Sequence, residues 1–157
     1  MARRPTEIER KWLVKEDPDL SPHNQVTISQ GYLCVSDKGA EVRLRREGKR
    51  FFQTVKTGAG LQRGEFEIEL SKDQFKRLWP ATRGRRLQKV RYSLKWRGKV
   101  IELDSYRKKL AGLKVAEVEF KTQKQAKAFS PPRWFGKEIT NIEKYGNADL
   151  AMRKGKP

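Results

Sequence analysis

Two short acidic motifs carry the clearest chemical signal in this sequence. Glu7-x-Glu9 and Glu117-x-Glu119 alternate with apolar residues, so each pair lies on one face of an expected strand with its carboxylates about 7 Å apart. Asp104 lies on a third expected strand. Carboxylate oxygens are the ligands that Mg²⁺ and Mn²⁺ prefer, and converging acids repel one another unless a cation neutralises them. These acids therefore predict a metal site if their strands converge, and solvated strand faces if they do not.

Basic residues recur on expected strand faces in the same way. Arg binds phosphate oxygens through two parallel hydrogen bonds, and Lys acts as a point charge, so a triphosphate would need several such groups. The candidates are Lys11, Arg43, Arg45, Lys56, Lys89 and Arg91. The alternative interpretation is a generally basic surface of the kind that binds nucleic acid.

Acids and bases together predict metal-assisted attack of water on the terminal phosphorus of a phosphate chain. A lysine that is buried among other cations has a lowered pKa and can then accept a proton from the water. Tyr32 and Lys89 are the candidates for this role. An equal alternative is that Tyr32 is a core aromatic residue and Lys89 a phosphate clamp.

The composition is that of a folded and strongly basic chain. Its 157 residues, 36% of them hydrophobic, suit one compact domain over residues 1–157. Lys and Arg number 37 against 19 Asp and Glu, and the net charge of +18 implies an anionic partner. Nucleic acid, an acidic membrane and a polyphosphate all qualify. The clustered acids favour a polyphosphate, because a binder of phosphate backbones has no use for them.

Cysteine content and hydropathy bear on the location of the protein. The single cysteine, Cys34, excludes an intrachain disulfide framework, so a reducing, cytoplasmic setting fits. We expect Cys34 to be a small buried apolar residue. No apolar run approaches the ~20 residues needed to cross a bilayer, so no membrane is expected as a partner. Residues 1–9 lack the apolar segment of a secretory signal.

About eight strands must position these side chains, many of them charged on one face and apolar on the other. The expected strands cover residues 7–14, 26–33, 40–47, 51–57, 65–70, 89–94, 101–104 and 115–120. An open sheet could turn the charged faces to solvent, whereas a closed antiparallel barrel would turn them into its lumen. Roughly eight strands close a barrel that is just wide enough for a small ligand.

Helices are expected to be few. Ser71 and Gln74 fit a capping box, followed by apolar residues with helical spacing. Residues 122–129 are expected to form a second helix, because two prolines follow it, and residues 147–153 a short third one.

These motifs, in this order, resemble the triphosphate tunnel metalloenzymes, also called the CYTH superfamily. The mark of that family is an N-terminal Glu-x-Glu-x-Lys strand, which corresponds here to residues 7–11. The resemblance covers nearly the whole chain, and the ordered set is far more specific than the first motif. It continues through Gln30-Gly31-Tyr32-Leu33, Val42-Arg43-Leu44-Arg45, Thr54-Val55-Lys56, Glu65-Phe66-Glu67, Lys89-Val90-Arg91-Tyr92, Glu102-Leu103-Asp104, residues 115–120 and residues 134–140, to Tyr145.

The resemblance implies a mainly β (α+β) fold, an eight-stranded antiparallel β-barrel that forms a charged tunnel with helices packed outside. It implies that Mg²⁺ or Mn²⁺ is held by Glu7, Glu9, Asp104, Glu117 and Glu119. It implies phosphate binding by Lys11, Arg43, Arg45, Lys56, Lys89 and Arg91, with Glu67 as a further tunnel acid. In the bacterial inorganic triphosphatase branch of this family a Tyr and Lys pair has been proposed to activate water, and Tyr32 and Lys89 match it by motif.

The compact size and the Gln-Gly-Tyr-Leu segment look most like the bacterial inorganic triphosphatase branch, which implies hydrolysis of tripolyphosphate to diphosphate and phosphate. The alternatives are a class IV adenylyl cyclase, a thiamine or nucleoside triphosphatase on the same scaffold, and a non-catalytic binder of RNA or polyphosphate. Contact of the basic surface with nucleic acid is not the favoured interpretation. The apolar outer strand faces leave room for a homodimer.

Overall fold

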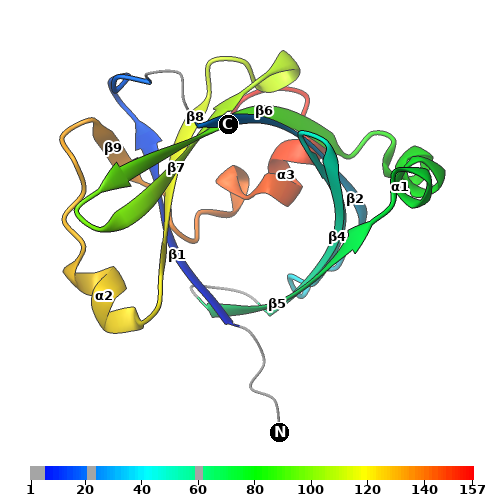
Figure 1. The fold of residues 1–157 in the computed structure, drawn as a ribbon, viewed down its shortest axis with the longest axis horizontal. Helices are drawn as coiled ribbons and strands as arrows, with labels where there is room; N and C mark the ends of the chain where they lie inside the picture. Colours follow the sequence, from blue (N-terminus) through cyan, green and yellow to red (C-terminus); the bar gives the residue numbers. More distant parts are fainter. Residues whose placement is uncertain (1–5, 21–23, 59–61) are drawn as a thin grey trace, which may run out of the picture.

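Antiparallel strands dominate the computed structural model, which describes residues 6–20, 24–58 and 62–157 (Figure 1). The strands are β1 (Thr6–Val14), β2 (Gln25–Val35), β3 (Glu41–Glu47), β4 (Arg50–Thr57), β5 (Gln62–Leu70), β6 (Arg86–Trp96), β7 (Lys99–Tyr106), β8 (Lys114–Phe120) and β9 (Phe135–Glu138). The helices are α1 (Lys72–Leu78), α2 (Gln123–Ala128) and α3 (Asn147–Met152), with 3-10 turns η1 (Trp79–Thr82), η2 (Lys108–Leu110) and η3 (Glu143–Tyr145).

Eight of the strands close into a barrel, in the order β5-β4-β3-β2-β6-β7-β8-β1. Closure comes from the antiparallel pairing of β1 with β5, in which Thr6 lies opposite Gly64. Figure 1 looks down this barrel. The eight-stranded antiparallel barrel expected from the sequence is therefore confirmed. The short strand β9, which pairs with β1 at Trp12 and Glu138, is an addition that the alternation did not reveal.

Apolar residues on the outer faces of the strands pack under helices α1 and α2. Phe75 of α1 packs with Leu44 and Leu70 of the barrel wall. Ala126 of α2 packs with a cluster that includes Trp12. The predicted capping box begins α1, since the Ser71 hydroxyl accepts a hydrogen bond from the backbone N–H of Gln74 and the Gln74 side chain accepts one from that of Ser71.

Helix α3 packs in a different place, against the inner faces of the strands. Leu150 is fully buried and belongs to a cluster with Tyr32, Leu87 and Val115, which lie on the lumen side of their strands. Figure 1 shows α3 inside the ring of strands. This apolar cluster fills one end of the barrel and leaves the charged side chains along the rest of the lumen.

The expectation that Cys34 is buried is wrong, because its side chain is exposed. The pairing of β2 with β3 shifts its register between Tyr32 and Cys34. Such an irregularity interrupts the strict alternation of faces along a strand. As a result Val35, rather than Cys34, packs against the internal cluster.

Among the described residues, none of the helices has the length and apolar character needed to cross a bilayer.

Candidate active site

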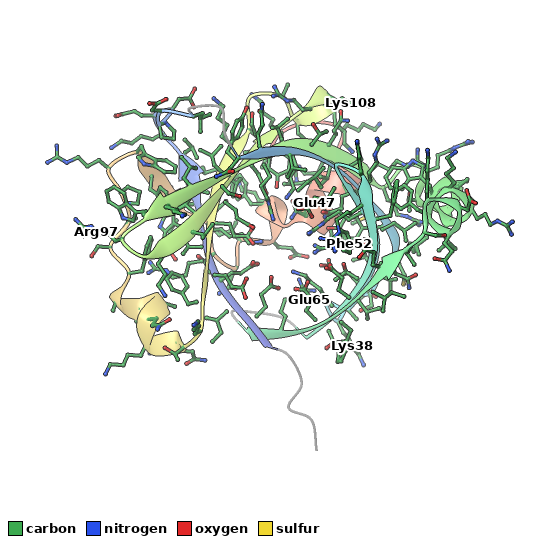
Figure 2. All side chains as sticks on the ribbon, in the orientation of Figure 1. Lys38, Glu47, Phe52, Glu65, Arg97 and Lys108 are labelled. Carbon is green, nitrogen blue, oxygen red and sulfur yellow. The ribbon has the colours of Figure 1, made fainter. Side chains whose placement is uncertain are left out.

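A cavity of about 560 Å³ occupies the barrel lumen, and charged side chains form most of its lining. Glu65 is one of them, and Figure 2 shows its side chain at the lumen. The lining also includes the β6–β7 hairpin at Gly98–Val100 and Asn147 at the start of α3. From the strands and the end of β8 come Glu7, Lys11, Arg43, Arg45, Lys56, Glu65, Glu67, Arg91, Glu102, Glu117, Glu119, Phe120 and Lys121.

Three acids converge on one side of this cavity. One carboxylate oxygen from each of Glu7, Glu9 and Glu117, which we call the carboxylate trio, lies within 4.8 Å of the other two. Oε2 of Glu9 is buried and has no hydrogen-bond partner among the described residues. Burial, and then repulsion by Glu117, raises the pKa of Glu9 to about 8. An unpartnered carboxylate oxygen beside two other acids fits a divalent cation, which prefers such ligands.

Glu119 lies next to the trio, because it is directly opposite Glu9 in the pairing of β1 with β8. Burial raises its pKa, as do the negative charges of Glu7 and Glu65. Glu119 could thus act as a further metal ligand.

Lys11 joins the same group of acids. Its ammonium lies 2.9 Å from Glu9 and 3.5 Å from Glu117. Burial alone would raise the pKa of Glu117, but Lys11 holds it well below its usual value. In this structure Lys11 therefore neutralises acids, and it faces the lumen where an incoming anion could also reach it.

Asp104 lies among bases rather than with the trio. It accepts hydrogen bonds from Nε of Arg91 at 2.7 Å, from Nη2 of Arg91 at 2.9 Å and from Lys89 at 2.5 Å. Burial opposes the ionisation of Asp104, but Lys89 and Arg91 lower its pKa below the usual value. Arg91 also forms an ion pair with Glu102 at 2.6 Å.

Two arginines on β3 have unused hydrogen-bonding capacity. Nε of Arg43 and Nε of Arg45 are buried without a partner among the described residues. Burial, and then the charges of Arg43 and Arg91, lowers the pKa of Arg45. Crowded cations with free donors favour the binding of an anion. Lys56, on β4, is instead paired with Glu7 at 2.7 Å.

Tyr32 and Lys89 are both fully buried, but their hydrogen bonds go to different partners. The Tyr32 hydroxyl accepts a hydrogen bond from Nε2 of Gln30 at 2.7 Å, whereas Lys89 binds Asp104. Burial lowers the pKa of Lys89 to about 7, and Arg91 lowers it while Asp104 opposes the shift. A lysine with this pKa can exchange a proton near neutral pH.

The cavity lining includes nine of the predicted site residues: Glu7, Lys11, Arg43, Arg45, Lys56, Glu67, Arg91, Glu117 and Glu119. The other four, Glu9, Tyr32, Lys89 and Asp104, are not part of this lining. Glu67 accepts a hydrogen bond from Thr54 at 2.8 Å. Sequence reasoning assigned no role to Glu65, Glu102 or Asn147, which also line the cavity. Glu65 and Glu102 each lie two residues before a predicted site acid, so strand alternation could have identified them. Asn147 had no such signal, because it belongs to α3.

The chain is similar to known proteins over nearly its whole length. A model of the CYTH domain family matches residues 5–149. An inorganic triphosphatase of Nitrosomonas europaea is 47% identical over 94% of this chain and 97% of its own length. An inorganic triphosphatase of Acetivibrio thermocellus is 31% identical over 92% of each chain. The solved structure of the inorganic triphosphatase NE1496 has a TM-score of 0.71, at 44% identity over 94% of this chain and 95% of that one.

Proposed function

The chain belongs to the CYTH domain family, and from this premise we propose that it hydrolyses inorganic tripolyphosphate to diphosphate and phosphate with the help of Mg²⁺ or Mn²⁺. The observation that carries the proposal is that the lumen offers both kinds of partner with unused bonding capacity. Among the described residues, Glu9 has a buried carboxylate oxygen without a partner, and Arg43 and Arg45 each have a buried Nε without one. Such a lumen suits a metal-bound polyphosphate, whose charges need both kinds of partner.

The acids would hold the metal. The trio of Glu7, Glu9 and Glu117 supplies three converging oxygens, and Glu119 and Asp104 are further ligands in this proposal. When bound, the divalent ion would withdraw charge from the phosphate oxygens and help to lower the pKa of an attacking water.

The bases would hold the substrate. Arg43 and Arg45 donate to phosphate oxygens through the groups that are unpartnered in this structure. Three further bases, which contact acids in this structure, would exchange part of those contacts for contacts with phosphate: Lys11, Lys56 and Arg91. Because the metal would neutralise the acids that these bases leave, the net charge of the lumen would stay close to zero. Hydrogen bonds between ionised groups are the strong ones, so this exchange orients the chain for in-line attack.

The water oxygen attacks the terminal phosphorus, the bridging P–O bond breaks, and diphosphate leaves. In this proposal Lys89 accepts the proton of the water, because burial holds its pKa near 7 and a neutral amine is therefore accessible. Tyr32 would orient the water or the phosphate from the neighbouring wall. With its one cysteine and no disulfide framework, the chain would act in the cytoplasm.

Phosphate release from tripolyphosphate, ATP and thiamine triphosphate tests this function, each with Mg²⁺, with Mn²⁺ and with a chelator. We expect fast, metal-dependent release from tripolyphosphate, weak release from ATP, and none from the Glu119→Gln variant. Formation of diphosphate and a cyclic nucleotide from ATP would instead indicate a cyclase. No turnover of any triphosphate with either metal would overturn the proposal.

A further inference from the structure

The barrel lumen does not account for the large positive charge of the chain. The cavity lining contains seven basic residues and six acidic ones. The remainder of the chain therefore holds 30 of the 37 basic residues and 13 of the 19 acidic ones, which places 17 of the 18 net charges outside the cavity. This excess must be explained by something other than the binding of a small substrate in the lumen.

One compact stretch outside the lumen concentrates this charge. Residues 72–86, which form α1, η1 and the turn into β6, contain one acid, Asp73. They contain six bases: Lys72, Lys76, Arg77, Arg83, Arg85 and Arg86. Among the described residues none of these six forms a salt bridge. Figure 1 shows α1 on the outside of the barrel, away from the lumen.

Arg85 is fixed by backbone carbonyls instead of by acids. Its Nε donates to the carbonyl oxygen of Tyr32 at 3.0 Å, and its Nη2 donates to that of Ala81 at 2.8 Å. The guanidinium thus keeps its whole charge, and its Nη1 has no bond to another described residue. These two hydrogen bonds hold the Arg85 side chain in one position, so a ligand need not order it on binding.

Arg86 is held in the same way. Its Nη2 donates to the carbonyl oxygen of Trp79 at 2.6 Å, its Nε donates to the Thr82 hydroxyl at 2.8 Å, and its guanidinium lies 4.4 Å from the centroid of the Trp79 ring. Burial, and then the nearby charge of Arg83, lowers the pKa of Arg86. Cations that are held close together without a counter-ion repel one another, and a bound anion relieves that repulsion.

We propose that the arginine cluster of Arg83, Arg85 and Arg86, extended by Lys76 and Arg77, binds long-chain inorganic polyphosphate on the outer wall of the barrel. Fixed guanidinium groups are the residues of choice for phosphate oxygens. Arg85 and Arg86 are fixed in this way, and with the exposed Arg83 they place three guanidinium groups within four residues. Such a cluster matches a chain that carries a negative charge on every phosphate.

Single-stranded nucleic acid fits this surface less well. Proteins that bind it without sequence preference stack its bases on aromatic side chains in addition to contacting its phosphates. The aromatic residue of this surface, Trp79, already stacks on Phe75 with ring centroids 4.9 Å apart and lies against Arg86. The cluster therefore offers charge without a free ring for a base.

The test measures the binding of end-labelled long-chain polyphosphate by fluorescence anisotropy. Binding is measured over a series of salt concentrations in the presence of a chelator. The R83Q/R85Q/R86Q variant is compared with K124Q/K127Q/K137Q, which removes the same charge from exposed positions elsewhere. We expect the cluster variant to bind roughly tenfold more weakly, with a salt dependence shallower by about 2 in logarithmic slope, and the control to change less than about twofold.

Arg85 and Arg86 also bond to the fold, so a second variant guards against a loss of structure. K76Q/R77Q/R83Q removes three charges of the same surface without breaking a hydrogen bond that the structure describes, and it should also bind more weakly than the control. Equal losses in cluster and control variants would overturn the site, as would failure of the wild-type protein to bind. Binding of an oligoadenylate RNA as tight as that of polyphosphate, and lost in the same variants, would overturn the choice of ligand.

Discussion

The Lys89 ammonium lies 2.5 Å from a carboxylate oxygen of Asp104, and both side chains are buried. Arg91 binds the same carboxylate through two nitrogens, at 2.7 and 2.9 Å. Asp104 thus fixes the position of Lys89 while Arg91 supplies a second positive charge. Lys89 can then lose a proton without leaving Asp104 unpaired, which is the arrangement that a proton acceptor requires.

Replacement of Lys89 by Met should lower kcat by about 100-fold or more, because general-base catalysis typically contributes that much. Asp104 keeps its two hydrogen bonds from Arg91, so the fold should persist with a Tm close to that of the wild-type protein. Steady-state phosphate release and thermal unfolding measure the two effects. Tyr32→Phe is the matched variant, since it removes one buried hydroxyl and leaves Lys89 in place.

Comparison of the two variants decides the role of each member of the proposed pair. The hydrogen bonds of Tyr32 and Lys89 go to different partners, so we expect Tyr32→Phe to cost less activity than Lys89→Met. A larger loss in the tyrosine variant, with Lys89→Met nearly fully active, would contradict the assignment of Lys89 as proton acceptor.

Glu9→Gln should weaken metal-dependent activity by about 100-fold or more, because it removes one carboxylate from the trio. The apo protein should lose little stability at pH 7, since the pKa of Glu9 near 8 means that this carboxyl is already mostly protonated. Titration with Mn²⁺ and unfolding in a chelator measure these effects. Glu69→Gln is a suitable control, because Glu69 is exposed, is paired with Arg50 and does not line the cavity. An equal loss of metal binding in that variant would refute the site.

Metal binding to the wild-type protein should release protons. The folded pKa of Glu9, about 8, lies above the usual value of 4.5, so the carboxyl carries a proton at pH 7 that a cation must displace. We therefore expect release of close to one proton per ion at pH 7, less release at pH 9, and an affinity that rises as pH increases through about 8.

The same shift fixes the sign of a stability effect in the apo protein. A carboxyl whose pKa is higher in the folded than in the unfolded state binds its proton more tightly in the folded state. Its contribution to the free energy of unfolding is therefore fully present below pH 4.5 and is lost as pH rises from about 4.5 to about 8.

The proton release that accompanies metal binding is measured by calorimetry in buffers of different ionisation enthalpy. Binding heats that do not depend on the buffer at pH 7 would contradict it.

Strand alternation predicted much of the barrel because it is a local property with a period of two residues. It placed Glu7, Glu9 and Lys11 on one face and Trp12 on the other, as the structure has them. Alternation does not reveal which charged neighbours pair. The contact of Lys11 with Glu117 follows from the register of β1 and β8, in which the two residues lie opposite each other, and that register depends on the whole barrel.

Two features had no local signal of this kind. The bulge in β2 turns Cys34 outwards, although its sequence neighbours continue the alternation. Helix α3 was expected from its sequence, but six residues cannot indicate which side of the sheet they cover. Its burial against Tyr32 and Leu87 depends on the size of the lumen, which the strand number and stagger decide.

Gly31 permits the close approach of η1 to β2, and its replacement by Ala should be destabilising. A Cβ at this position would lie 2.6 Å from Oγ1 and 2.7 Å from Cβ of Thr82. Thr82 cannot turn away freely, because its hydroxyl donates to the carbonyl oxygen of Trp79 and accepts from Arg86. Overpacking of this kind costs about 1–3 kcal/mol in the free energy of unfolding.

A double-mutant cycle separates this contact from any general effect of the methyl group. Thr82→Gly removes the atoms that would clash, so Gly31→Ala should cost less in that background than in the wild-type protein. Denaturant unfolding of the four proteins gives the coupling free energy. Equal costs in the two backgrounds would show that Thr82 is not what requires a glycine at position 31. A cost seen only when Thr82 is present would show that Thr82 requires a glycine at position 31. Because the Thr82 hydroxyl accepts a hydrogen bond from Arg86, the position of Arg86 would then depend on this glycine of β2.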